Sequence, residues 1–271
     1  MKNMILISLF IVGCSENQTP WTAYQALDTQ LCLPNMDRQL DAAEFPLFQE
    51  QSAEYWIGGA RELDFLIGQT EAGVPIWNFQ GNTEADQLIE MGAVRLDSQW
   101  YAPHFSDGQW VIANDAEETS VGVYRFDENA LWLLGVASSE EEPEAGQTLL
   151  VYDAPAALLQ FPMKLGDAFQ QEAQITDGVS NGLPFYGTHR YDVSVSKLGE
   201  LYLDDIIFSE SYRVNTSFTI IPSIGDPFSV KQSSFFSECF GELVRLESER
   251  NASDFSFSTV QRIRRFSFLC E

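Results

Sequence analysis

Positive charge is scarce in this sequence. Lysine and arginine together number 15, against 40 aspartates and glutamates, so the formal net charge is −25. A surface of this kind repels nucleic acid and anionic headgroups. Arg262, Arg264 and Arg265 form a basic cluster among strand-forming residues, and we expect it to be one solvated face of a strand. The charge balance therefore argues against a nucleic-acid partner.

Residues that commonly carry catalysis are also few. The only histidines are His104 and His189, both in loop-like contexts, and no phosphate loop or dinucleotide fingerprint occurs. Acidic pairs such as those at 204–205 and 117–118 arise by chance in so acidic a chain, and only geometry could assign them to a hydrolase. We therefore predict no catalytic residues, no cofactor and no enzymatic activity.

The sequence also lacks the spacing of a metal site. No Cys-x-x-Cys occurs and the two histidines are isolated. The densest acidic stretch, 138–146, lacks the alternating acids and the glycine of a calcium loop, so we interpret it as a solvated linker. Two explanations of the overall acidity remain open. One is a saline habitat, where the Debye length falls below about 8 Å and the salt screens the repulsion between surface charges. The other is calcium binding.

The N-terminus carries an apolar run from Met4 to Val12 that is too short to span a membrane, which takes about 20 residues. Lys2 precedes the run, and a small residue and Cys14 follow it, which is the build of a secretory signal peptide. Residues 1–13 are therefore predicted to be a targeting segment and not part of the fold.

The tetrad Ile11-Val12-Gly13-Cys14 resembles the signal of bacterial lipoproteins. The resemblance implies cleavage before Cys14, which would carry a diacylglyceryl thioether and an amide-linked fatty acid such as palmitate. It also implies attachment to the cell envelope, and Ser15, where an Asp would retain the protein at the inner membrane, favours the outer membrane. The periplasmic and external faces both stay open. The alternatives are an ordinary signal peptide with an incidental cysteine, or a buried N-terminal strand.

Three further cysteines remain for an oxidising compartment, namely Cys32, Cys239 and Cys270. The segment between Cys239 and Cys270 is interpreted as two strands around a turn at 250–254, which would bring these two sulfurs together. We predict this disulfide, worth roughly 3.5 to 4 kcal/mol in the loop-entropy model. A bond from Cys32 to either partner is the alternative.

The body of the chain has the pattern of an antiparallel β protein. Hydrophobic residues make up 45% of the chain, which excludes global disorder. Short helices are predicted at 21–31, 35–40 and 84–91, the last from a capping pattern. Tyr191, Val193 and Val195 alternate with polar residues on one strand, and a turn is predicted after it at 197–200. Strand-like runs separated by turn residues are found at 61–68, 74–79, 93–100, 109–114, 120–126, 130–136, 148–152, 201–214, 215–221 and 228–236.

We therefore expect a mainly β fold, with a large antiparallel sheet that is curved or forms a sandwich, and a few short helices near the N-terminus. Residues 14–54 would be a tether and a partly helical segment. Residues 55–271 would be the β body, with two possible lobes at 55–137 and 147–271.

Four segments of the body occur in a recognisable order. They are 130–135 (Ala-Leu-Trp-Leu-Leu-Gly), 149–155 (Leu-Leu-Val-Tyr-Asp-Ala-Pro), 161–169 (Phe-Pro-Met-Lys-Leu-Gly-Asp-Ala-Phe) and 235–244 (Phe-Phe-Ser-Glu-Cys-Phe-Gly-Glu-Leu-Val). This order resembles that of uncharacterised β-rich secreted proteins and lipoproteins of Gram-negative bacteria. The resemblance implies no catalytic residues, and Gly166 and Gly241 are expected to open tight turns.

Twenty phenylalanines can form either a sandwich core or a curved sheet with an apolar concave face. We expect a membrane-anchored lipoprotein with a non-enzymatic binding or structural role and an envelope protein or apolar ligand as its partner. The first alternative is a carrier of a lipid or other apolar ligand in a concave β-sheet, which a cavity of ~300 Å³ or more would support. The second is a carbohydrate hydrolase, which needs two carboxylates ~5 to 9 Å apart across a cleft.

Overall fold

The computed structural model describes residues 32–45, 52–70, 72–81, 85–256 and 258–268. The predicted signal peptide, Cys14, the predicted helix at 21–31 and Cys270 lie outside the described residues. The described residues from Cys32 onward form one compact unit. Among the described residues, no helix is long and apolar enough to cross a membrane.

The fold is mainly β, as predicted, and is built on one curved sheet of 15 strands. Along the main path of the sheet, every pair of neighbouring strands is antiparallel. The strands of this path, in spatial order, are β6 (Gln87–Gly92), β2 (Ser52–Gly58), β19 (Arg262–Phe266), β17 (Gly241–Arg250), β16 (Phe228–Ser237), β15 (Ile206–Pro222), β14 (Leu183–Leu203), β13 (Ala168–Ser180), β11 (Leu149–Gln160), β10 (Ala130–Ser138), β9 (Ser120–Phe126), β8 (Trp110–Ala113) and β7 (Val94–Arg95).

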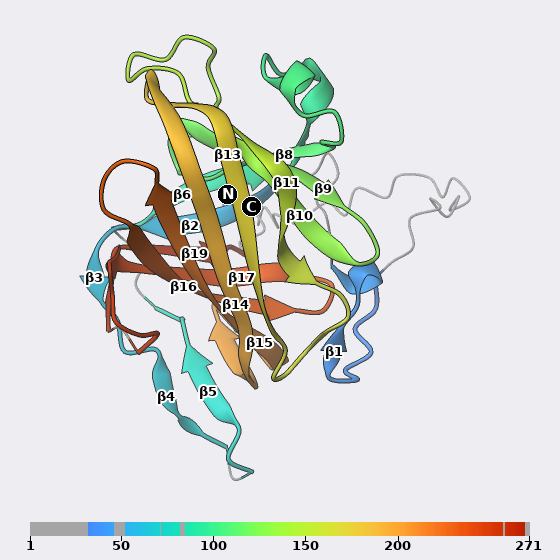
Figure 1. Cartoon of the computed structure of the whole chain (residues 1–271). Coiled ribbons are helices and arrows are strands. Elements are labelled where there is room, and N and C mark those ends of the chain that lie inside the picture. Colours follow the sequence, from blue (N-terminus) through green and yellow to red (C-terminus); the bar gives the residue numbers. More distant parts are fainter. Residues whose placement is uncertain (1–31, 46–51, 71, 82–84, 257, 269–271) are drawn as a thin grey trace, which may run out of the picture. The chain divides into compact units, whose positions relative to one another are not determined.

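Smaller elements surround this path. The hairpin of β4 (Leu66–Gln69) and β5 (Pro75–Asn78) joins the sheet where β5 pairs in parallel with β14, and it projects from the sheet in Figure 1. Two separate two-stranded ladders pair β1 (Gln39–Leu40) with β12 (Met163–Lys164) and β3 (Arg61–Glu62) with β18 (Thr259–Val260). The short 3-10 helices of the described residues are η1 (Ala42–Glu44), η2 (Leu96–Ser98) and η3 (Ala102–His104).

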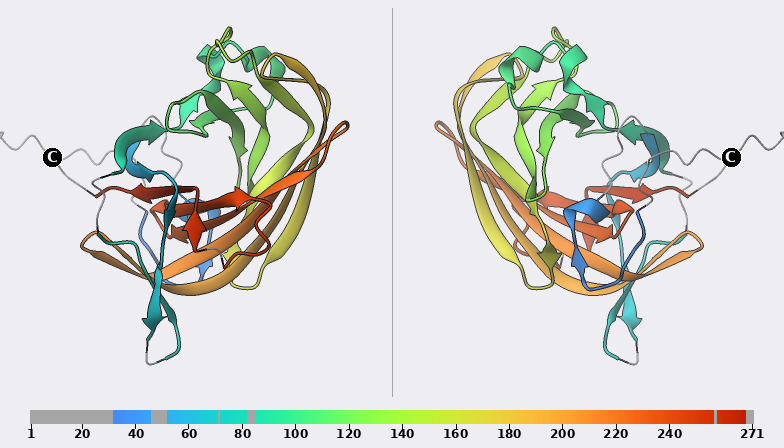
Figure 2. Two further views of the ribbon diagram at one scale, coloured as in Figure 1. Left: turned by 90° about the vertical axis from the view of Figure 1, so that its left-hand side faces the viewer. Right: turned by 90° about the vertical axis from the view of Figure 1, so that its right-hand side faces the viewer.

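The long hairpin of β14 and β15 runs through the middle of the sheet. Its pairing extends from Gly187–Pro222 to Leu203–Ile206, and Figure 2 shows both strands bending as they cross the sheet. The predicted turn at 197–200 is wrong, because β14 continues through it and the chain turns at Asp204 instead. Two register shifts in this stretch accommodate its polar residues without ending the strand.

The two faces of the central strands contact separate cores. Side chains alternate between the faces along a strand, so Tyr191, Val193 and Val195 all lie in the core of the concave face, as their spacing predicted. The opposite face is covered by the β4–β5 region, where Trp77 and Phe79 pack around Phe235 with ring centroids 4.9 and 5.0 Å away. One sheet therefore supports two layers of apolar packing.

Two of the predicted helices are strands or turns instead. Residues 84–91 were predicted to be helical from a capping pattern, but Gln87–Gly92 forms β6, which pairs Ile89 with Tyr55 and Met91 with Ala53. Residues 35–40 lead into β1, and the capping box of Asp41 and Glu44 belongs to the short helix η1. Pairing with a distant strand overrides the local helical signal in both places.

The predicted disulfide between Cys239 and Cys270 is wrong, because Cys239 is bonded to Cys32 with a Cα–Cα distance of 5.4 Å. The hairpin expected between 239 and 270 does exist, since β17 pairs with β19, but its ladder ends at Val244. Beyond it the chain turns, and the N–H of Cys239 donates to the carbonyl oxygen of Glu44 at 2.8 Å. This contact places Cys239 beside the N-terminal segment that contains Cys32.

The acidic stretch at 138–146 connects β10 to β11, which are neighbours in the sheet. Glu140, Glu141, Glu142 and Glu144 are exposed, so the prediction of a solvated connection is confirmed. The sheet continues across this connection and joins the two stretches that could have been separate lobes.

Candidate functional site: a cavity on the concave face of the sheet

A cavity of about 600 Å³ lies against the concave face of the sheet. Pockets that hold small molecules commonly measure about 300 to 1,000 Å³. Most of its wall is aliphatic and aromatic, and the apolar side chains that line it include Phe45, Leu131, Leu133, Val136, Leu150, Leu158, Leu159, Phe185, Phe218, Ile220 and Phe236.

Cross-strand pairing brings the polar part of the wall together. Residues paired directly opposite one another point to the same face of a sheet. Val214 of β15 pairs with Ser234 of β16, which in turn pairs with Arg245 of β17. In the next row on this face, Thr216 pairs with Gln232 and Gln232 with Glu247. These residues all line the cavity.

A β-bulge in β17 adds Glu242 to the same wall. Phe235 pairs with Val244 whereas Phe236 pairs with Glu242, so Leu243 is an extra residue on β17. Leu243 and Val244 therefore both point into the core of the opposite face. Glu242 and Arg245, which an uninterrupted strand would place on opposite faces, share the cavity face instead.

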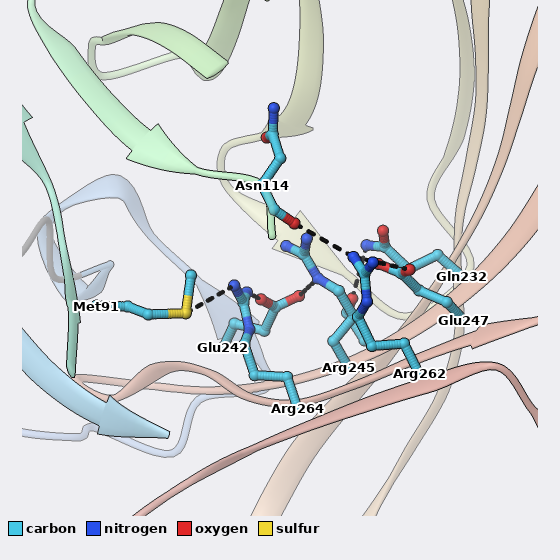
Figure 3. A network of polar contacts seen from close by, with 9 residues as sticks. Met91, Asn114, Gln232, Glu242, Arg245, Glu247, Arg262 and Arg264 are labelled. Carbon is cyan, nitrogen blue, oxygen red and sulfur yellow. Dashed lines mark hydrogen bonds and ion pairs between the residues drawn. The ribbon is translucent and has the colours of Figure 1, made fainter. Parts of the chain in front are cut away.

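Glu242 is held between two arginines, as Figure 3 shows. The Nε of Arg245 donates to Oε1 of Glu242 at 2.8 Å, and Nη2 of Arg264 forms an ion pair with Oε2. Arg264 also lies over the ring of Tyr55, with its guanidinium carbon 5.1 Å from the ring centroid, and its Nη1 is 4.0 Å from Sδ of Met91. All five residues line the cavity.

A second ion pair lies beside the first. Nη1 of Arg262 is 3.7 Å from Oε2 of Glu247, and it donates to the backbone oxygen of Asn114 at 3.4 Å. Glu242 is thus shared by two arginines, whereas Glu247 has one. The five charged side chains together carry one net positive charge, in a chain whose formal net charge is −25.

Glu242 and Arg245 each hold the other in its charged form. Burial alone would raise the pKa of Glu242, but the guanidinium groups of Arg245 and Arg264 outweigh it and lower the pKa to about 2. Burial would likewise lower the pKa of Arg245, but the attraction of Glu242 raises it above its ordinary value. Both groups are therefore ionised at neutral pH.

A second polar group in the wall is His189, on β14. Its Nδ1 is 2.8 Å from the hydroxyl oxygen of Tyr152, which is itself 2.7 Å from the hydroxyl oxygen of Tyr191. The imidazole is 3% exposed, and burial lowers its pKa to about 4, so it is neutral at pH 7. Within the part of the chain that the structure describes, Nε2 is buried and has no hydrogen-bond partner.

The predicted solvated face at Arg262, Arg264 and Arg265 is wrong for two of the three residues. Neighbouring residues of a strand point to opposite faces, so Arg264 lines the cavity while Arg265 is buried on the other side. There Arg265 donates to the carbonyl oxygen of Phe79 at 3.0 Å and to Asp86 at 2.5 Å. Only Arg262, whose side chain is 44% exposed, resembles the prediction.

The other candidate residues are not gathered into a site. His104 is exposed at the end of η3, whereas His189 is buried inside β14, so the loop prediction was wrong for His189. The acidic pairs at 204–205 and 117–118 lie in turns outside the cavity wall. Across the described ranges, no group of three or more His, Cys, Asp or Glu side chains could hold a metal ion.

Sequence reasoning missed the cluster around Glu242. A spacing of three residues gives no reason to pair Glu242 with Arg245 in a strand, and no local signal marks the bulge at Leu243. The available signal was the alternation of Gln232, Ser234 and Phe236 on one predicted strand, which indicates one face of β16 but not what lies opposite it.

Comparison with known proteins finds no matching family model, no matching curated protein and no matching solved structure. The resemblances noted in the sequence therefore stay predictions.

Proposed function

We propose that this protein binds a lipid or another largely apolar small molecule in the cavity of its concave sheet, as a carrier or receptor and not as an enzyme. The observation that carries the proposal is the cavity itself, about 600 Å³ with a mainly apolar wall. This volume lies within the range of ~300 to 1,000 Å³ that is typical of small-molecule pockets.

The chemistry of the wall favours binding over hydrolysis. A glycosidase needs one carboxyl group whose pKa is raised so that it can donate a proton. Of the two carboxylates in the wall, Glu242 has a pKa lowered to about 2 and is already paired with two arginines. Glu247 is paired with Arg262. Glu242 is therefore suited to holding arginines in place and poorly suited to donating a proton.

The sequence supports the proposed location. The lipoprotein-like tetrad that ends at Cys14 would attach the mature chain to the cell envelope, with the outer membrane favoured. Two or three acyl chains bind a bilayer much more firmly than one chain does. A lipid-anchored binding protein at a membrane would work close to a supply of apolar ligands.

Native mass spectrometry of the full-length protein purified from its host tests the proposed binding. We expect a retained small molecule that is released on denaturation. Thr216→Trp should prevent its retention, because Thr216 lines the cavity and the larger ring would fill it. The matched control is Gln174→Trp, which adds the same ring at an exposed position of β13. An empty wild-type protein that also takes up no apolar probe would refute the proposal.

A further inference from the structure

We propose that the ligand of this cavity is a long-chain carboxylic acid of the fatty-acid class, whose carboxylate contacts Arg245 and Arg264 while its hydrocarbon chain lies along the apolar wall. This inference rests on the proposed function and adds the chemical class of the ligand. It would make the protein selective for an ionised acid over a neutral lipid of the same length.

The charged side chains at the polar end of the cavity favour an anionic ligand. In the cavity wall, Arg245 and Arg264 share the single carboxylate of Glu242, so these three side chains carry one net positive charge. The other carboxylate of the wall, Glu247, is paired with Arg262, which is 44% exposed. A single carboxylate would neutralise the net positive charge. Uncompensated charge inside a protein is unfavourable, so an anionic ligand would be favoured there over a neutral one.

The guanidinium group of Arg245 has hydrogen-bond donors that could bind such a ligand. Arg245 donates to Glu242 through Nε, and among the described residues no partner is found for its two terminal nitrogens. Its side chain, which lines the cavity, is 30% exposed, and Figure 3 shows the guanidinium end directed from the sheet toward the wall that carries Asn114. A guanidinium fork with free terminal nitrogens can bind both oxygens of a carboxylate.

Glu242 acts as the positioning residue for this contact. It accepts from Arg245 with one oxygen and from Arg264 with the other, which holds two like charges side by side. Arg264 is further held over Tyr55. The arginines are therefore fixed before a ligand arrives, which lowers the entropic cost of binding.

The shape of the apolar wall suits an extended chain. The row that contains Arg245 crosses β15 at Val214, whereas His189 lies opposite Ile220 of the same strand. Val214 and Ile220 are about 20 Å apart along β15 at the usual rise of a strand. Thr216, Phe218 and Ile220 line the cavity between these two ends. A long hydrocarbon chain can follow this path.

The experiment compares two probes of equal length on the full-length protein, namely hexadecanoate and hexadecan-1-ol, by displacement of a fluorescent apolar dye at neutral pH. We expect the acid to bind about 10-fold or more tightly than the alcohol, the gain typical of a hydrogen-bonded charge. Arg245→Gln should remove most of this preference, measured as the ratio of the two affinities in the same variant. Arg245→Lys, which keeps the charge, should retain part of it.

Arg190→Gln is the matched control for the loss of one positive charge. Arg190 is on β14 next to His189, but it points to the other face, where it pairs with Asp192 at 3.5 Å. The inference is overturned if the wild type binds acid and alcohol equally, or if Arg190→Gln reduces acid binding as much as Arg245→Gln does. Should Arg245→Gln fail to fold, the wild-type comparison and Arg245→Lys decide. Absence of binding of both probes would instead refute the proposed function.

Discussion

Glu242 accepts a hydrogen bond of 2.8 Å from Nε of Arg245, three residues later on the same strand. Regular strand geometry places residues at this spacing on opposite faces. The extra residue Leu243 changes the phase of β17, so an apolar side chain goes into one core while a carboxylate turns into the cavity. One bulge thus serves both the packing of one face and the chemistry of the other.

Removing the charge of Glu242 should destabilise the protein. Glu242→Gln would leave Arg245 and Arg264 close together without their shared carboxylate, and breaking a buried pair in this way costs about 3 kcal/mol. Glu249→Gln, at an exposed position of the same strand, should change the free energy of unfolding by less than about 0.5 kcal/mol. Urea denaturation at pH 7 measures both.

The ion pairs of Glu242 with Arg245 and Arg264 predict that the protein becomes less stable in acid. The folded-state pKa of Glu242, about 2, lies below the ordinary 4.5, so the stabilisation is fully present above that ordinary value. It should decrease as the pH falls from about 4.5 through about 2. Glu242→Gln should lack this part of the pH dependence, and an unchanged acid profile in that variant would contradict the prediction.

His189 should make stability depend on pH in a higher range. Its folded-state pKa is about 4 against 6.5, so the unfolded chain binds the extra proton first and the folded state loses stability as the pH falls from 6.5 to 4. The loss attributable to this group is roughly 3 kcal/mol at most. The difference in unfolding free energy between wild type and His189→Gln should shrink over this interval.

The control for this measurement is His104→Gln, because His104 is exposed on η3. This variant removes a surface histidine and leaves the buried imidazole of His189 in place. Equal pH profiles for the two variants would mean that the neutral imidazole between Tyr152 and Phe218 does not oppose protonation.

The disulfide can be tested by peptide mapping without reduction. We expect one cross-linked peptide that contains Cys32 and Cys239, which are separated by 207 positions in the sequence. Closing a loop of this length stabilises the folded state by up to about 5 kcal/mol in the entropy model, so Cys32→Ser should lower the midpoint of thermal unfolding. Cys270→Ser should leave the cross-linked peptide intact. A peptide joining Cys239 to Cys270 would contradict the structure.

Acylation of Cys14 is the prediction on which the proposed location depends. Cells grown with an alkyne-labelled palmitate should incorporate the label into the wild type and into Cys32→Ser, but not into Cys14→Ser. Mass analysis of the N-terminal peptide should find a mature chain that begins at a lipid-modified Cys14. An unmodified thiol there, or an uncut leader, would refute the envelope location.

Local pattern was enough to predict much of the sheet. The strands at 120–126, 130–136 and 228–236 are where turn residues and alternating apolar residues predicted them. These signals are local, because a strand half buried on a face must alternate and a tight turn needs particular residues. They failed at 84–91, where a capping pattern outweighed weak alternation, and at 197–200, where register shifts accommodate polar residues inside a strand.

The sequence by itself determined the β class, the antiparallel order of neighbouring hairpins, the acidic surface and the alternation that gives the central strands two faces. Only the tertiary structure decided that Cys239 bonds to Cys32, that Arg264 and Arg265 point to opposite sides, and that Glu242 joins Arg245 in a cavity. The physical reason is that these outcomes depend on register, bulges and curvature. Such features arise from contacts between strands far apart in the chain and leave no periodic trace in either strand alone.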